Sequence, residues 1–95
     1  MSVTPRTVQE TVTDATPEQV LAQAKVFFAT RPKLYAAFPD KEGPGFCSLR
    51  GQGGEEIVIA VRPAEGGGTQ VTGSTYLYEM QLARFLATLS PVGAA

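Results

Sequence analysis

The sequence contains no histidine, and its single cysteine is Cys47. Histidine is the commonest general base and the commonest metal ligand, so its absence argues against most hydrolase and metalloenzyme mechanisms. One cysteine excludes an intramolecular disulfide and a zinc site built from several thiolates. We therefore expect no metal, no cofactor and no catalytic residue, and we interpret Cys47 as a structural residue of a cytoplasmic protein.

Clusters of positive charge are also missing. Nine acidic residues against eight basic ones give a net charge of −1, whereas nucleic acids and anionic lipids attract clustered Lys and Arg. No segment approaches the ~20 consecutive apolar residues of a membrane-spanning helix. The first eleven residues also lack the apolar region of a signal peptide. We therefore expect neither a nucleic-acid partner nor a membrane partner.

The overall composition and the length are those of a small globular protein. Hydrophobic residues make up 43% of the chain and charged residues 18%, values that are typical of a folded domain. A chain of 95 residues corresponds to one domain, because domains usually have ~100–200 residues. We expect a single domain over residues 1–95, with its core at about 6–89 and a tail at 90–95.

Alternating polarity predicts a strand over residues 6–14, RTVQETVTD. One face of this strand carries Val8, Glu10 and Val12, and we expect it to point toward the core. Glu10 would then be partly buried, which favours general acid chemistry; a bulge, an edge position or a basic partner would instead keep it solvated. Threonine and glutamine side chains form the other face, which we expect on the open side of the sheet: Thr7, Gln9, Thr11 and Thr13.

A helix follows this strand, and its start is clearly marked. Thr16 and Gln19 form a capping box, with Pro17 at the first helical position. Apolar residues recur at three- and four-residue spacing and form one stripe: Val20, Leu21, Ala24, Phe27 and Phe28. The dipeptide Arg31-Pro32 ends the helix, because a residue that precedes proline avoids helical geometry.

Four strands and a second helix complete the predicted fold. The strand segments are LYAAF, GFCSLR, EEIVIAVR and TQVTGS, and glycine-rich turns separate them. The closing helix spans about Tyr76 to Leu89, with Ser74 or Thr75 as its cap. The fold class is α+β: a five-stranded antiparallel sheet with two helices on one face, in the order β-α-β-β-β-β-α.

The most regular stretch is EEIVIAVRPAEGGGTQV, residues 55–71, which predicts a β-hairpin. Alternation places Ile57, Ile59 and Val61 in the core, and Val58 and Ala60 on the opposite, open face of the sheet. The glycine cluster lies between two strands. A phosphate-binding loop needs a helix directly after the glycines, so this cluster indicates a turn.

The same order of segments resembles a shortened START-like, or helix-grip, domain over residues 7–89. The matching segments are the capped helix at TPEQV, the strand turn EGGGTQVTGSTY and the closing helix YEMQLARFLATL. START-like domains bind apolar ligands in a cavity, but this chain lacks the extra strands and second small helix of full-length members. The order also resembles a TATA-binding-protein-like repeat, without the basic DNA-facing surface. The resemblance supports the fold rather than a specific function.

Three hypotheses for the function follow. The first is a non-catalytic interaction or assembly module, a homo-oligomer that associates through Val58 and Ala60 on the open sheet face. The second is a START-like binder of a small apolar ligand between helices and sheet. Its ligand-binding residues would be Phe27, Phe28, Tyr78, Phe85 and Glu10. The third hypothesis, which has the weakest support, is an enzyme that uses Glu10 with a tyrosine.

Overall fold

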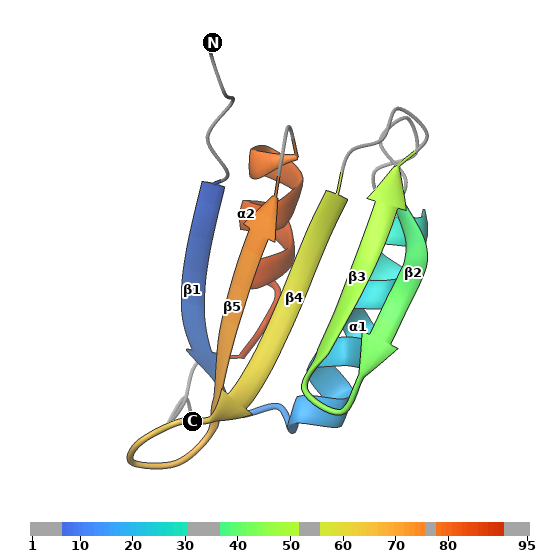
Figure 1. The fold of residues 1–95 in the computed structure, drawn as a ribbon. Helices are drawn as coiled ribbons and strands as arrows, with labels where there is room; N and C mark the ends of the chain where they lie inside the picture. The colour runs from blue at the N-terminus through green and yellow to red at the C-terminus, as the bar shows by residue number, and fades with distance from the viewer. Residues whose placement is uncertain (1–6, 31–36, 52–55, 76–77, 91–95) are drawn as a thin grey trace, which may run out of the picture.

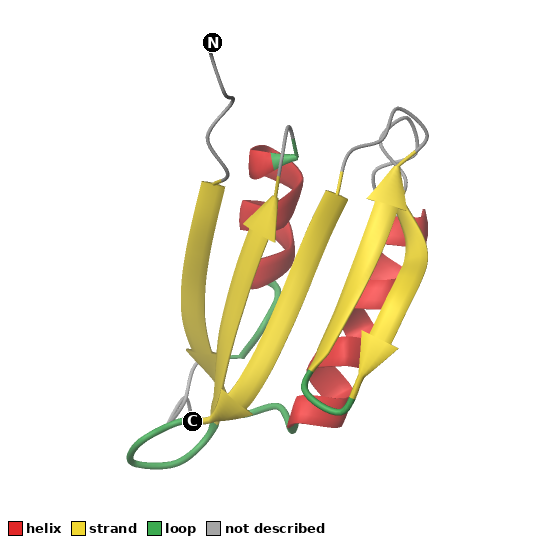
Figure 2. Ribbon diagram, viewed as in Figure 1, coloured by secondary structure: helices red, strands yellow, loops and turns green. Residues whose placement is uncertain are grey.

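The computed structural model describes residues 7–30, 37–51, 56–75 and 78–90. Figure 2 shows the strands and helices, and Figure 1 labels them. Their bounds, in chain order, are β1 (Thr7–Thr13), α1 (Pro17–Thr30), β2 (Ala37–Gly43), β3 (Phe46–Gly51), β4 (Glu56–Pro63), β5 (Thr69–Thr75) and α2 (Glu79–Ala87). This order confirms the predicted one.

The strands form one antiparallel sheet of five, in the order β1-β5-β4-β3-β2. The middle strand is therefore β4, and the edges are β1 and β2. Figure 1 shows both helices on the same side of the sheet, with α1 behind β2, β3 and β4 and α2 behind β1 and β5. The predicted fold class, a two-layer α+β arrangement, is confirmed.

The start of α1 has the predicted capping box. The backbone N–H of Thr16 donates to Gln19 Oε1 at 2.9 Å, and the backbone N–H of Gln19 donates to Thr16 Oγ1 at 3.1 Å. These two bonds satisfy donors that the first helical turn leaves unpaired. From there the helix buries Val20, Ala24 and Phe28 completely against the sheet.

The hairpin of β4 and β5 also has the predicted orientation. Ile57 and Ile59 are fully buried beneath the helices, whereas Val58 and Ala60 are half-buried on the opposite face. The connecting turn reaches a positive φ of 107° at Gly67, a conformation that residues with a Cβ rarely adopt.

The face assignment of β1 was wrong. Val8 is 59% exposed and Val12 38% exposed, and Glu10 between them is exposed as well rather than partly buried. The threonine and glutamine face is turned toward the helices instead of the open side. Gln9 Nε2 donates to the carbonyl oxygen of Glu79 at 3.1 Å, so α2 provides a hydrogen-bond acceptor for the polar face of this edge strand.

Polar contacts also anchor the two ends of β1. Thr7 Oγ1 donates to Glu79 Oε1 at 3.4 Å, and Thr13 Oγ1 donates to the carbonyl oxygen of Ser90 at 2.6 Å. The same carbonyl accepts the backbone N–H of Asp14 at 3.0 Å. Ser90 therefore connects the end of α2 to β1, although it was predicted to begin the tail; residues 91–95 lie outside the described residues.

Two predicted boundaries also differ from the structure. The strand predicted at LYAAF instead runs from Ala37 to Gly43, and residues 34–36 lie outside the described part. An irregular register between Pro39 and Lys41 lets this edge strand continue past the proline, because a bulge tolerates the missing N–H. Sequence patterns had indicated a turn at that proline.

The second helix begins later than predicted, at Glu79. Ser74 and Thr75 belong to β5, and Thr75 Oγ1 donates to the carbonyl oxygen of Glu56 at 2.8 Å. Neither residue is therefore the cap; Tyr78 occupies that position without a capping hydrogen bond from its side chain. The hydroxyl of Thr75, which was predicted as a possible cap, instead forms a hydrogen bond between β5 and β4.

Candidate functional site

The open face is the surface of the sheet that is turned away from both helices. No described helix covers it, and in Figure 1 it is turned toward the viewer. The register of the strands assigns to it Val8, Glu10, Val12, Phe38, Lys41, Phe46, Ser48, Arg50, Glu56, Val58, Ala60, Arg62, Gln70, Thr72 and Ser74.

Small apolar and hydroxyl side chains occupy the centre of the open face. Val58 on the middle strand lies opposite Ser48 on one neighbour and Ser74 on the other. Ala60 lies in the next row, opposite Phe46 and Thr72. None of these six residues is charged, so the centre of the open face can be dehydrated without burying a charge.

The aromatic ring of Phe46 is the largest side chain near this centre. It lies across Gly43 on the edge strand β2, where a Cβ atom would approach its Cε1 atom to 2.4 Å. The ring is 39% exposed, so it covers backbone on one side and still presents an apolar surface to solvent. It extends the uncharged centre toward the β2 edge.

Charged residues surround this centre. At one end Arg50 Nη2 lies 3.4 Å from Asp40 Oδ2 and 3.6 Å from Glu56 Oε2. These exposed ion pairs contribute less than about 1 kcal/mol each, because water screens them. Arg62 lies at the opposite end of the middle strand. Glu10 and Lys41 lie on the two edge strands, β1 and β2.

The five predicted ligand-binding residues do not form one site. The rings of Phe27, Phe28 and Phe85 do come together, with centroid distances of 5.2, 5.5 and 5.3 Å. However, Phe28 and Phe85 are fully buried and Tyr78 is 5% exposed, so all three belong to the core. Glu10 lies on the far side of the sheet from this aromatic cluster.

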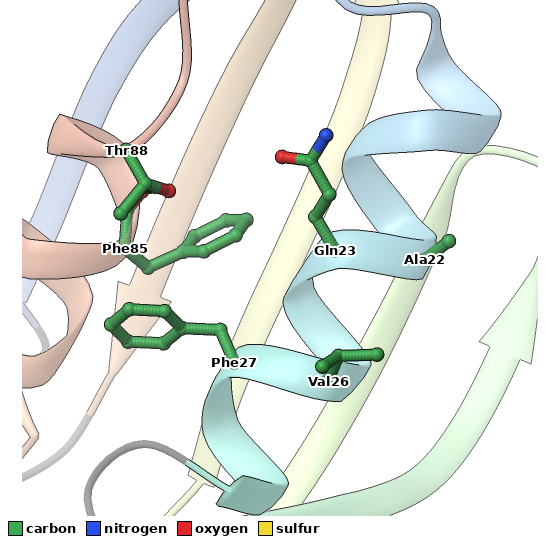
Figure 3. A pocket seen from close by; sticks show the side chains of 6 residues that line it. All are labelled: Ala22, Gln23, Val26, Phe27, Phe85 and Thr88. Carbon is green, nitrogen blue, oxygen red and sulfur yellow. Dashed lines mark hydrogen bonds between the residues drawn. The ribbon is translucent and has the colours of Figure 1, made fainter.

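A groove does exist, on the outer side of the helix layer between α1 and α2. Its volume is about 410 Å³, and its lining residues are Ala22, Gln23, Val26, Phe27, Phe85 and Thr88. Figure 3 shows Phe27 and Phe85 at the side of the groove nearest α2. Phe27 and Phe85 were both predicted as ligand-binding residues, whereas the other four lining residues were not. Val26 is 64% exposed and lies outside the predicted apolar stripe. A valine in that position was the sequence feature that could have indicated an outward-facing apolar surface.

The single thiol is buried on the helix side of the sheet. Cys47 is fully buried, and burial raises its pKa to about 11. Nearby, Lys25 forms an ion pair with Glu42, which raises the pKa of the lysine. At neutral pH the thiol is therefore protonated and unreactive. Within the described part of the chain, no three His, Cys, Asp or Glu side chains are grouped so as to hold a metal ion.

The raised thiol pKa predicts a loss of stability at alkaline pH. Because the folded thiol ionises at about 11 and its ordinary value is 9.0, stability is present below pH 9 and falls as the pH rises toward 11. At pH 10 the loss should be about 1 kcal/mol. Urea unfolding at pH 8 and pH 10 should show it in the wild type. Cys47→Ala should lack this component, and identical pH dependence in both proteins would contradict the assignment.

Comparisons with protein-family models, with curated proteins and with solved structures find no match to this chain. Neither described helix combines the length and the apolar character needed to cross a membrane.

Proposed function

We propose that the protein is a non-catalytic interaction module that associates with itself through the open face of its sheet. One observation carries this proposal: apolar side chains line both faces of the middle strand. Ile57 and Ile59 face the core, while Val58 and Ala60 face away from it. A sheet with one face in water usually carries polar residues on that face.

The exposed apolar residues support the same surface. Of the large hydrophobic side chains exposed in the described part, four lie on the open face, at exposures of 38–59%: Val8, Val12, Phe38 and Phe46. Val8 and Val12 lie on the β1 edge, and Phe38 and Phe46 lie toward the β2 edge, so exposed apolar side chains flank the centre of the open face on both sides. An uncharged centre with a charged perimeter is also the usual anatomy of a protein–protein interface.

The size of the open face indicates a weak association. Five strands of about seven residues cover roughly 24 by 23 Å, because strands lie about 4.8 Å apart and rise about 3.3 Å per residue. Two such faces would bury roughly 1,100 Å², near the lower limit for specific interfaces. We therefore expect a dimer that dissociates on dilution.

Val58→Lys should abolish or strongly weaken this dimer. The lysine charge would be solvated in the monomer and lose its water in the dimer, so association should weaken by about tenfold or more while folding is retained. Sedimentation equilibrium over a concentration series measures the association, and circular dichroism verifies the fold. Val58 is half-buried between the neighbouring strands, and neither of the two described helices lies above it.

Val26→Lys is the matched control. Val26 is also an exposed valine, at 64%, but it lines the groove on the helix side. We expect its substitution to leave the molar mass unchanged. A loss of association in Val26→Lys and not in Val58→Lys would place the interface on the helices. A wild type that stays monomeric at high concentration would contradict the self-association.

A START-like ligand-binding role is the second candidate, and the groove between the helices favours it. Its volume of about 410 Å³ lies within the range of ~300–1,000 Å³ that small-molecule sites occupy. The site would be formed by the outward residues around Phe27 rather than by Phe28 and Tyr78. If the wild type is monomeric, a bound mass in native mass spectrometry would support this candidate. We do not propose an enzyme, because Glu10 is exposed and Tyr78, the tyrosine among the described residues, lies on the other side of the sheet. Tyr35 and Tyr76 lie outside the described residues.

A further inference from the structure

We infer that the outer edge of β1 is a strand-addition site that binds an extended peptide segment of a partner protein. The segment pairs with β1 in the antiparallel direction and carries a basic residue, Lys or Arg, opposite Glu10. This inference goes beyond the proposed function, because it concerns the backbone at one edge of the sheet rather than the centre of the open face. In such sites main-chain hydrogen bonds provide the affinity and side chains provide the specificity.

The two edges of the sheet differ in their resistance to an added strand. Edge strands are usually protected by proline, by bulges or by charged residues. The β2 edge has all three, because its register shifts between Pro39 and Lys41 and residues 40–42 are all charged. The β1 edge has no proline and no bulge, and it pairs with β5 in one unbroken register. Apart from Gln9 and Glu10, every residue of β1 is β-branched, which favours strands.

The backbone groups on the outer edge of β1 belong to Val8, Glu10 and Val12. In an antiparallel sheet, successive residues of an inner strand bond alternately to its two neighbours. The N–H of Ala64 donates to the carbonyl oxygen of Gly68 at 3.1 Å, so the even-numbered residues of β5 bond to β4 and its odd-numbered residues bond to β1. Odd-numbered residues of β5 pair with odd-numbered residues of β1. The even-numbered residues of β1 therefore direct their N–H and C=O groups outward.

Asp14 confirms this direction and closes one end of the edge. It is the next even-numbered residue after β1, and its N–H donates to the carbonyl oxygen of Ser90 at 3.0 Å. Along β1 itself, no described strand pairs with the outer edge, and Figure 1 shows α2 behind the sheet rather than beside β1. The outward groups of β1 are therefore accessible to an added strand.

Glu10 determines which segment fits this edge. It is exposed and lies between Val8 and Val12, which are 59% and 38% exposed on the same face. Directly opposite side chains of an antiparallel pair stabilise it when their charges are opposite and destabilise it when they are alike. A second copy of β1 that pairs all three residues places Glu10 opposite Glu10. A segment with a basic residue between two apolar ones, at alternate positions, complements all three residues instead.

A synthetic peptide of sequence TVTKTVT tests the site, with TVTETVT as its matched control. Paired in the antiparallel direction, the central lysine lies opposite Glu10 and the two valines lie opposite Val8 and Val12. In low salt, TVTKTVT should bind the wild type at least about fivefold more tightly than TVTETVT. Fluorescence anisotropy of the labelled peptides measures this, and the preference should reverse in Glu10→Lys. Equal binding of the two peptides to the wild type would overturn the inference.

Amide hydrogen exchange identifies the edge that the peptide occupies. In the free protein the N–H groups of Gln9 and Thr11 bond to β5 and should exchange slowly, while those of Val8, Glu10 and Val12 should exchange fast. TVTKTVT should slow the exchange of these last three. Slower exchange on the helices, with no change along β1, would contradict a site at this edge.

A proline substitution tests the role of the outward N–H groups. Val8→Pro removes one of them, and an edge strand tolerates proline where the N–H faces solvent. TVTKTVT should bind this variant at least about threefold more weakly, whereas Val8→Thr, which keeps the shape and the N–H, should bind it as the wild type does. Circular dichroism verifies that both variants fold. If Val8→Pro instead abolishes self-association without peptide, a second copy occupies the edge and the inference of a partner segment is wrong.

Discussion

Phe28→Ala should lower the free energy of unfolding by about 3–5 kcal/mol, the usual cost of truncating a buried phenylalanine. Phe28 is fully buried on α1, and its ring contacts those of Phe27 and Phe85 with centroid distances of 5.2 and 5.3 Å. The truncation therefore removes buried area, leaves a cavity in the core and breaks one of the two aromatic contacts that link α1 to α2. Urea denaturation followed by circular dichroism measures the loss.

Arg50→Ala is the control for this prediction. Arg50 is exposed, and its ion pairs with Asp40 and Glu56 span 3.4 and 3.6 Å, so its removal should cost less than about 1 kcal/mol. Equal shifts in the denaturation midpoint for the two variants would show that the core does not depend on the aromatic cluster.

Gly73→Ala should cost about 1–3 kcal/mol, the usual penalty for overfilling a packed core. A Cβ atom at position 73 would lie 2.4 Å from Leu82 Cδ1, and Leu82 is fully buried. The added methyl group would therefore push α2 away from β5. Thermal or chemical unfolding of the variant measures the effect.

A double-mutant cycle identifies the cause of this loss. In the Leu82→Ala background the methyl group at position 73 meets no leucine side chain, so Gly73→Ala should then be nearly neutral. Gly43→Ala is a second control. Its Cβ would meet the Phe46 ring at the same 2.4 Å, but that ring is partly exposed and can rotate away. If Gly73→Ala costs as much without Leu82 as with it, the backbone and not the packing requires glycine.

Elements with strong local signals were predicted correctly. The capping box of Thr16 and Gln19 fixes the start of α1 through bonds between residues three apart, so no distant contact can change it. The β4–β5 hairpin is equally local, because strict alternation and a glycine turn determine which residues share a face. These two features, with the apolar stripes of the helices, predicted the fold class.

The candidate site was predictable only in part. Val58 and Ala60 were placed on the open face by alternation within their own strand, and the structure confirms that position. The rest of the face depends on which strands lie beside β4, and a sequence does not state its strand order. Of the residues that line the groove, only Phe27 and Phe85 were predicted to bind a ligand, because the groove forms where the outer surfaces of two helices far apart in the sequence come together.

By itself, the sequence determined the fold class, the orientation of the middle hairpin and the capped start of the first helix, because each depends on neighbouring residues. Only the tertiary structure decided the face of β1, which is an edge strand whose Gln9 and Thr13 side chains find backbone oxygens on and after α2. A hydrophobicity pattern assigns the faces of a strand correctly when one face is apolar and the side chains of the polar face have no hydrogen-bond partners elsewhere in the fold. Here the polar side has partners 70 or more residues away, so tertiary hydrogen bonds outweighed the burial of Val8 and Val12 and left both valines on the open face.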